Sequence, residues 1–155
     1  MTDDMKKDWE LSVSRHIAAP PEAVWQVMTE RMPDWFCPKP WRVEIVEQDR
    51  RAGGREAMIM HGPNGEQIHN EGIYLAYEPG RRIVVTDALD SAFRPQGPFM
   101  VGIFEIAPDG AGTRYTASAR HWTEGDMQKH KEMGFEEGWG ICADQLKALC
   151  EEGAA

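Results

Sequence analysis

The side chains best suited to chemistry in this chain are five histidines and three cysteines. No two histidines are four residues apart, and neither an HExxH nor a CxxC motif occurs, so the spacing predicts no zinc site. A nucleophile elbow, a P-loop and a dinucleotide-binding fingerprint are absent as well. An odd number of widely spaced cysteines forms no disulfide framework. The motifs therefore predict no catalytic residues, no metal and no cofactor.

His121 is the histidine whose position favours a role in binding. Alternation along residues 113–122 divides the segment into a polar face and a second face. That second face carries Tyr115, Ala117, Ala119 and His121. The alanines leave space beside the imidazole, which both donates and accepts hydrogen bonds when it is neutral. His121 is therefore either a polar group of a pocket or a core histidine that is bonded to the backbone.

The segment from about Thr123 to residue 150 predicts one long helix with an apolar stripe. At 100° per residue, the stripe consists of Phe135, Trp139, Cys142, Leu146 and Leu149. Gly138 falls inside the stripe, where the missing side chain lets the helix backbone approach a neighbour closely. Gly134 falls at the edge of the stripe. Gly140 falls on the opposite side, which we expect to be exposed.

The elements that position these residues follow from the periodicity of the apolar side chains. Residues 8–18 alternate as a strand, and the prolines at 20 and 21 begin a helix. Turn residues then separate six further strands, at 41–49, 51–61, 66–78, 81–89, 99–107 and 113–122. This order predicts an α+β fold in which one helix covers one face of a large antiparallel sheet.

Length and charge exclude several classes of function. A chain of 155 residues is about one domain, and its net charge of −9 disfavours nucleic acid as a partner. No apolar run approaches the ~20 residues that span a bilayer, so we expect no membrane association. The N-terminus lacks the apolar core of a signal peptide, and we therefore expect a cytoplasmic protein.

Four motifs resemble those of one known family. The stretch "APPEAVW" at 19–25 looks like the family's entry into its first helix, and "WFCP" at 35–38 resembles the turn that follows. "DRRAGG" at 49–54 is similar to its Asp-x-Arg-x-Gly-Gly signature, and "HKEMGFEEGWGICADQLKAL" at 130–149 resembles its closing helix. In this order, the motifs resemble the activator of Hsp90 ATPase C-terminal-like (AHSA1-type) family of the START/Bet v 1-like (SRPBCC) superfamily.

The resemblance implies a helix-grip fold. In that fold a curved antiparallel sheet of about six to seven strands wraps a long C-terminal helix, and two short helices follow strand 1. A cavity lies between the helix and the sheet. We expect one such domain over residues 1–155, with its core at about 10–150. Gly134 and Gly138 would then lie where the helix crosses the sheet or roofs the cavity, although close packing without a cavity would serve equally.

A cavity of this kind is lined by inward strand positions and by the helix stripe. The family pattern places apolar residues at 56, 58 and 60. Glu56 departs from this pattern, so it lies either at the cavity mouth or in solvent. The methionines and tryptophans either fill the core or contact a ligand. The candidate lining residues are Trp35, Trp41, Glu56, Met58, Met60, Tyr115, His121, Phe135, Gly138, Trp139 and Cys142.

Three functions remain open from the sequence. We expect first a binding protein for a small apolar or aromatic molecule, because most ligand sites are apolar cavities with few polar groups. The second is a cyclase- or hydrolase-like enzyme with His121 or Glu56 as acid or base, a step that fold alone does not establish. The third is a chaperone-associated interaction domain. The eukaryotic activator has a separate N-terminal domain that this chain lacks, so we do not expect chaperone stimulation. A homodimer stays open.

Overall fold

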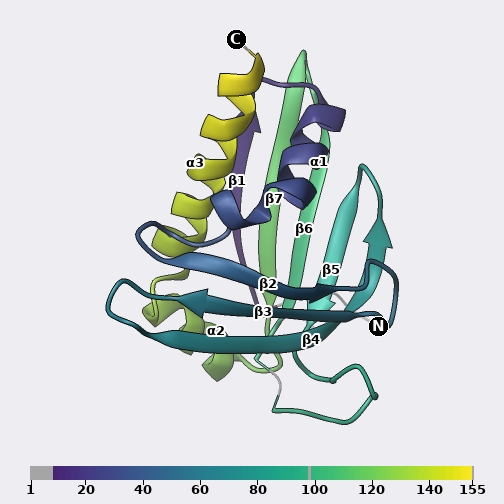
Figure 1. Ribbon diagram of the computed structural model, residues 1–155, viewed down its shortest axis with the longest axis vertical. Coiled ribbons are helices and arrows are strands. Elements are labelled where there is room, and N and C mark those ends of the chain that lie inside the picture. The colour runs from purple at the N-terminus through teal and green to yellow at the C-terminus, as the bar shows by residue number, and fades with distance from the viewer. Residues whose placement is uncertain (1–8, 98, 155) are drawn as a thin grey trace.

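Seven antiparallel strands form one curved sheet (Figure 1). The computed structural model describes residues 9–97 and 99–154. The strands are β1 (Glu10–Ile17), β2 (Arg42–Gln48), β3 (Arg55–His61), β4 (Gln67–Glu78), β5 (Arg82–Thr86), β6 (Val101–Asp109) and β7 (Gly112–Arg120). Their order across the sheet is β1-β7-β6-β5-β4-β3-β2. The predicted α+β class and antiparallel sheet are therefore confirmed.

The first and the last strand of the chain lie side by side. Leu11 of β1 is opposite Ala119 of β7, and Ile17 is opposite Thr113. On the other face of the same pair, the hydroxyl groups of Ser14 and Thr116 are 3.3 Å apart. The alternation of apolar and polar residues in the sequence therefore separates an inner from an outer face of the sheet.

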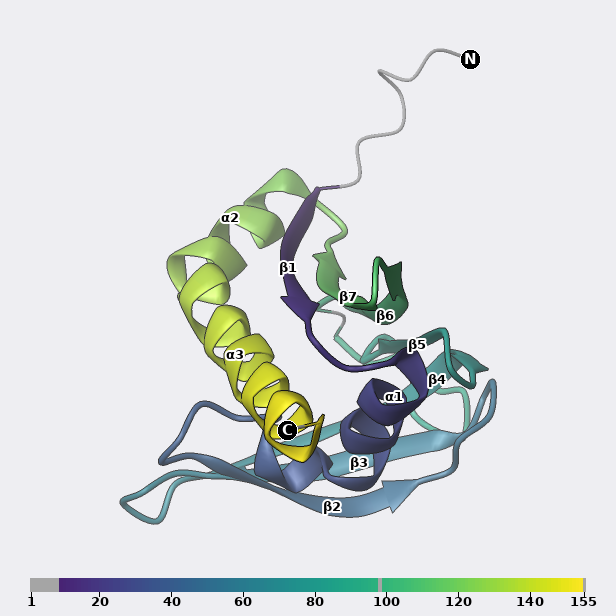
Figure 2. The ribbon, with the colours of Figure 1, turned by 90° about the horizontal axis from the view of Figure 1, so that it is seen from above.

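Two short helices follow β1 and lie inside the curve of the sheet (Figure 2). They are α1 (Pro21–Glu30) and η2 (Met32–Asp34), a single 3-10 turn. A proline in the first turn of α1 costs no hydrogen bond, because that N–H has no partner within a helix. Val24 and Met28 are the buried residues of α1. Together, α1 and η2 close one end of the space between the sheet and the C-terminal helix.

The C-terminal segment forms two helices, and the prediction of one helix from about 124 to 150 is wrong. α2 spans Glu124–Glu132 and α3 spans Phe135–Ala154. The hydroxyl group of Thr123 accepts a hydrogen bond from Asp126 N at 3.1 Å and caps α2. Gly134 has φ +92°, a left-handed conformation that glycine adopts at little cost. Gly134 is therefore needed to end α2, and not for close packing.

The other two helix glycines are placed opposite to the sequence expectation. A side chain added at Gly138 would have no neighbouring atom within 4 Å, so this residue faces open space. Gly140 is buried, and a Cβ atom there would lie 3.0 Å from Nη2 of Arg15 on β1. The reason is that α3 lies along β1 at the edge of the sheet rather than over its centre (Figures 1 and 2). The side of α3 that carries Gly140 is thereby covered.

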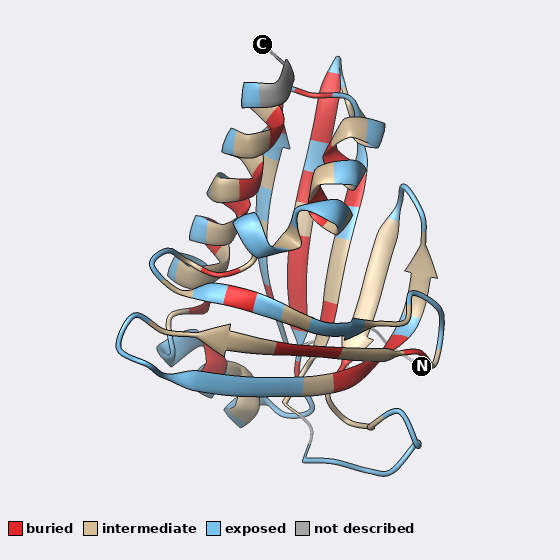
Figure 3. Cartoon of the chain, viewed as in Figure 1, coloured by how far each residue is buried: buried red, intermediate tan, exposed pale blue. Residues whose placement is uncertain are grey.

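The core lies where α1 and α3 meet the inner face of β7 (Figure 3). Its largest fully buried side chains include Ile17, Val24, Tyr115 and Leu146. Burying one Ile, Val or Leu side chain contributes about 1.5–3 kcal/mol, so this junction fixes α3 against the sheet. None of the helices in the described ranges combines the length and the apolar character that crossing a membrane requires.

Candidate functional site

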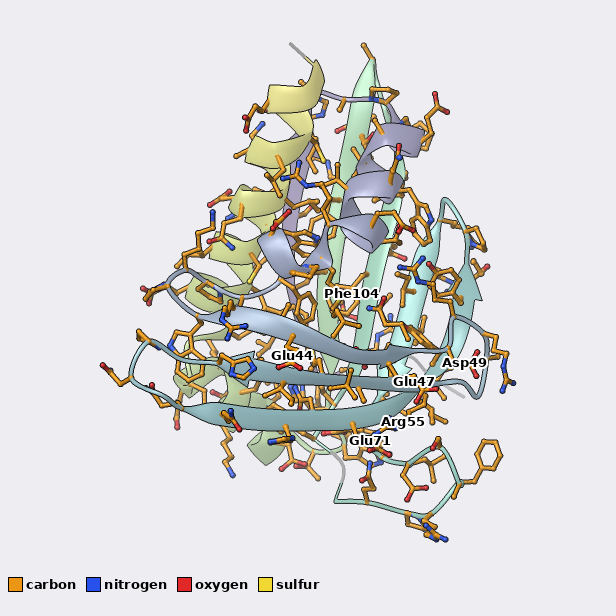
Figure 4. The ribbon with its side chains drawn as sticks, viewed as in Figure 1. Glu44, Glu47, Asp49, Arg55, Glu71 and Phe104 are labelled. Carbon is orange, nitrogen blue, oxygen red and sulfur yellow. The ribbon has the colours of Figure 1, made fainter. Side chains whose placement is uncertain are left out.

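A row of aromatic rings crosses the inner side of the sheet and ends on α3. Phe104 of β6 stacks on Trp139 of α3, with ring centroids 5.6 Å apart and planes inclined by 14°. Phe36, which follows η2, lies 5.8 Å from Phe104, the residue labelled near the centre of Figure 4. All three rings are only partly buried although they lie on the inner side. Part of each ring therefore stays accessible instead of being packed into the core.

At Gly138, α3 separates from the segment that follows η2. One turn later, Cys142 Sγ donates a hydrogen bond to Phe36 O at 3.1 Å. Gln145 continues this contact, because its Nε2 donates to Trp35 O and Cys37 O, each at 2.9 Å. Gly138 lies on the same side of the helix but has no atom of that segment in reach. The C-terminal part of α3 is thus bound to the segment after η2, and space opens at Gly138.

Several polar groups on the inner side have no hydrogen-bond partner within residues 9–97 and 99–154. They are the carboxyl group of Glu56, the hydroxyl groups of Tyr74 and Tyr115, and Nε2 of His130. Yet no fully enclosed side-chain nitrogen or oxygen of the described residues lacks a partner. These groups therefore border space that solvent or a ligand can reach. Tyr115 exposes only 1% of its surface, so its hydroxyl group is almost completely shielded from bulk solvent.

Burial without a partner shifts the acid–base properties of these groups. Loss of water disfavours the charged form and raises the pKa of Glu56 to about 7. Burial, together with the nearby charge of Glu56, raises the pKa of Tyr74 on the neighbouring strand. Burial also raises the pKa of Tyr115. The inner side therefore offers uncharged hydroxyl groups and one carboxyl group that changes its charge near neutral pH.

His121 faces inward, as predicted, but its ring is occupied by two partners. Its Nδ1 lies 2.8 Å from Trp9 O, and its Nε2 lies 2.8 Å from Nδ1 of His130 on α2. The bond to the backbone agrees with the second of the two interpretations drawn from the sequence. Burial, and to a smaller extent His121, lowers the pKa of His130 to about 4, so the ring of His130 is neutral at pH 7.

The predicted tryptophans do not all lie on one wall. Trp35 is a core residue, because its Nε1 donates to Met28 O at 3.3 Å and its ring meets Tyr115 edge to face. Trp41 packs against the apolar cluster of Cys37, Val43 and Met58. It also borders a surface hollow of about 550 Å³ beside Leu149. Trp139 belongs to the aromatic row, and Trp35 contacts it through Phe36, with ring centroids 5.5 Å apart.

The remaining predicted residues fall into two groups. Phe135 packs on Trp139 and on His130, with ring centroids 4.5 Å and 5.1 Å apart. Met58 and Met60 belong to the cluster beneath β2 and β3, Met58 buried and Met60 partly buried. Glu56 lies on the same face of β3 as these methionines, since strand positions alternate. The structure thus brings Phe135, Trp139 and His121 together around His130, while Glu56 lies beside Tyr74 on the inner face of β3 and β4.

Sequence reasoning missed several residues of this region. Phe104 shares the inner face of β6 with Ile106, so alternation alone could have identified it. Phe99 lies 4.6 Å from His130; the sequence placed it at the start of the strand at 99–107, whereas the structure begins β6 at Val101. No sequence pattern indicated His130, because only the turn between β7 and α2 brings it close to His121. A helix wheel of the assumed single helix could not show this pairing.

A second open hollow lies on the outer face of the sheet. It measures about 570 Å³, and its lining includes Val46, Arg55, Glu71 and Gln96. Arg55 bonds Glu47 and Glu71 there, each at 2.9 Å, and Figure 4 labels all three. Charges that neutralise one another leave little to attract a ligand. Of the predicted lining residues, only Met58 borders this hollow. The hollow is therefore not the candidate site.

The curved sheet that wraps α3, with α1 and η2 closing one end, defines a helix-grip protein of the SRPBCC type. The chain belongs to the family of activator of Hsp90 ATPase homolog 1-like proteins, whose family model matches residues 18–151. The resemblance seen in the four sequence motifs is thereby confirmed.

Solved structures share this fold over most of their length. A protein from Nitrosomonas europaea is 37% identical, with a TM-score of 0.84, over 94% of this chain and 96% of that chain. A protein from Chromobacterium violaceum is 25% identical, with a TM-score of 0.73, over 90% and 96%. An AHSA1 protein from Silicibacter pomeroyi, 19% identical with a TM-score of 0.71 over 93% and 99%, shows likeness in fold alone. No curated protein matches the chain.

Proposed function

We propose that the protein binds a small apolar or aromatic molecule between the inner face of the sheet and α3. The observation that supports this is the stacked pair of Phe104 and Trp139, which stays partly exposed beside the open space at Gly138. Two rings held in parallel by packing offer a third ring an offset or edge contact worth about 0.5–1.5 kcal/mol beyond burial. Partly exposed aromatic side chains on a concave face are typical of a ligand site.

The polar groups of the same side indicate a neutral ligand rather than an anion. Glu56 becomes a carboxylate as the pH rises through about 7, and a buried carboxylate repels an anionic guest. The hydroxyl groups of Tyr74 and Tyr115 both donate and accept hydrogen bonds, and neither is used by the described chain. A largely apolar molecule with one or two polar atoms suits this arrangement.

The cyclase- or hydrolase-like alternative has less support. His121 uses both ring nitrogens in bonds to Trp9 and His130, so of the two proposed acid–base residues only Glu56, with a pKa of about 7, is available to a substrate. Burial raises the pKa of Cys37 to about 11 and that of Cys142 to about 12, and a protonated thiol is a poor nucleophile. The chaperone-associated alternative rests on the family description, and we do not adopt it.

Calorimetric titration with 2-naphthol, a neutral aromatic probe, tests the proposal. We expect saturable binding with one molecule per chain. The test variant has both Phe104 and Trp139 changed to leucine. If this variant binds 2-naphthol as tightly as the wild type does, the probe binds elsewhere and the proposed site is contradicted. Native mass spectrometry of freshly purified protein then identifies the natural ligand if one is retained.

Gly138→Leu should block the site without unfolding the protein. The new side chain enters open space, so it meets no packing clash, and replacing a helical glycine stabilises by up to about 1 kcal/mol. We expect the affinity for 2-naphthol to fall at least about tenfold, because the side chain occupies the space of the ligand. Ala148→Leu, at an exposed position of the same helix, is the control and should bind as the wild type does. Equal affinity in both variants would exclude Gly138 from the site.

A further inference from the structure

The two buried histidines form a directed pair whose protons can be assigned from their partners. A carbonyl oxygen only accepts, so His121 Nδ1 donates its proton to Trp9 O. In the neutral ring, His121 Nε2 then carries a lone pair and accepts a hydrogen bond from His130 Nδ1. The proton of His130 is thereby used at Nδ1. Its Nε2 is left as a lone pair, which can accept a hydrogen bond but cannot donate one.

The backbone holds this direction in place. Trp9 O accepts from the main-chain N–H of His121, at 3.3 Å, as well as from Nδ1 of the same residue, at 2.8 Å. Trp9 itself has φ +36°, a conformation that is costly for a bulky residue and that persists only when its surroundings impose it. The carbonyl is thus fixed by the fold. His121 is a positioning residue, which acts on His130 and not on a ligand.

The free nitrogen of His130 lies at the end of the aromatic row. The His130 ring meets Trp139 edge to face, with centroids 5.8 Å apart, and Trp139 stacks on Phe104. Phe99 and Phe135 pack against the same ring, at 4.6 Å and 5.1 Å. His130 is 6% exposed, yet its Nε2 has no partner among the described residues and is not fully enclosed. The lone pair therefore borders open space within an aromatic surrounding.

We propose that His130 Nε2 accepts a hydrogen bond from the bound molecule, whose class is then an aromatic compound with a hydroxyl or a ring N–H group. This inference rests on the proposed function. An aromatic guest against Trp139 buries its ring, and its hydroxyl hydrogen satisfies the one acceptor at the end of the row. A carboxylate or an ether of the same size offers only lone pairs there, and two facing acceptors repel each other.

A matched pair of probes tests the hydrogen bond separately from the binding site. 2-Naphthol and 2-methylnaphthalene have nearly the same size, but only the first donates a hydrogen bond. Calorimetry gives the ratio of their dissociation constants for the wild type, for His130→Phe, and for His69→Phe, an exposed control on β4. We expect His130→Phe to lower the preference for 2-naphthol about tenfold, and His69→Phe to leave it unchanged.

The outcomes separate the inference from the proposed function. Binding of both probes with the same ratio in the wild type and in His130→Phe would overturn the inference and leave the ligand site standing. Failure of the wild type to bind either probe would overturn both.

Nitrogen-15 NMR of the histidine rings in the wild-type protein gives an answer that does not depend on a variant. We expect the free protein to show His130 protonated at Nδ1 and unprotonated at Nε2, with the Nε2 signal shifting when 2-naphthol is added. A proton on Nε2 of the free protein, or an Nε2 signal that 2-naphthol leaves unchanged at saturation, would overturn the inference.

Discussion

At the scale of single residues, the polar side chains of the proposed site lower the stability of the folded protein. Glu56 occupies a position where Met58 and Met60, on the same face of β3, continue an apolar strand. It has no salt bridge or hydrogen bond within the described residues, and burial alone raises its pKa to about 7. A carboxyl group that ionises in such a place destabilises the folded chain. The fold therefore tolerates Glu56 best when it is protonated.

Glu56→Gln should stabilise the protein at neutral and alkaline pH but not at acidic pH. The native pKa of about 7 lies above the ordinary value of 4.5, so the favourable neutral state is fully present below pH 4.5 and is lost as the pH rises through 7. Glutamine stays neutral throughout. Urea unfolding at pH 8.5 should show the variant to be more stable by about 2 kcal/mol, and at pH 4.5 the two proteins should differ little. Glu136→Gln, at an exposed position of α3, is the control.

The same gain at both pH values would mean that the carboxyl group is not desolvated. A gain that is shared by Glu136→Gln would indicate an effect of net charge instead, because both variants remove one negative charge.

At the scale of elements, Gly134, Gly138 and Gly140 of the C-terminal segment have three different roles. Gly134 ends α2 in a left-handed conformation, Gly138 leaves space beside the aromatic row, and Gly140 lies against Arg15 of β1. Arg15 also pairs with Asp144 of α3 at 2.7 Å. The break at Gly134 lets α2 and α3 take different directions, which places His130 beside His121 while α3 follows β1. The site thus depends on the joint between the two helices.

The same substitution at two of these glycines should have opposite effects. Gly134→Ala forces a Cβ atom into a left-handed backbone and should destabilise by about 1 kcal/mol. Gly138→Ala places its methyl group in open space and should stabilise by up to about 1 kcal/mol, because alanine favours a helix. Thermal melts of the two variants against the wild type measure both signs. Equal melting temperatures would show that α2 and α3 form one continuous helix in solution.

At the scale of the whole molecule, the packing of helices against the sheet shields the three cysteines from solvent. Cys37, in the segment after η2, and Cys150, near the end of α3, are buried, and Cys142 is partly buried between them. Burial raises their pKa values to about 11, 11 and 12, respectively. The thiols of the folded protein are therefore protonated at neutral pH. Their burial depends on the packing of α1, η2 and α3 against the sheet.

The native protein should react slowly with a thiol reagent such as DTNB at pH 7.5. A pKa raised from 9 to about 11 or 12 lowers the thiolate fraction about 100- to 1,000-fold, and only the thiolate reacts. All three cysteines should react rapidly in 6 M guanidinium chloride, which serves as the reference for the unfolded chain. A fast phase in the native protein would show that the segment after η2 opens readily from α3.

Local pattern in the sequence determined the architecture of this protein. Alternation and turn residues identified the seven strands and the inward side of β7, and four ordered motifs identified the family, because each depends on neighbouring residues only. The helix break could also have been read from Gly134, since glycine is common just after a helix end. The same patterns named Glu56, His121 and Trp139 as candidate residues, and their role in binding stays a prediction.

Only the tertiary structure decided which faces meet. The position of α3 along β1, rather than over the sheet centre, buried Gly140 and opened the space at Gly138. The turn after β7 places His130 beside His121. Neither residue's own segment could show that His130 Nδ1 is the partner of His121 Nε2. A helix wheel gives the angles between side chains, but the rotation of the helix is set by its packing against distant strands. For that physical reason the site residues on α2 and α3 had to be located in the folded molecule.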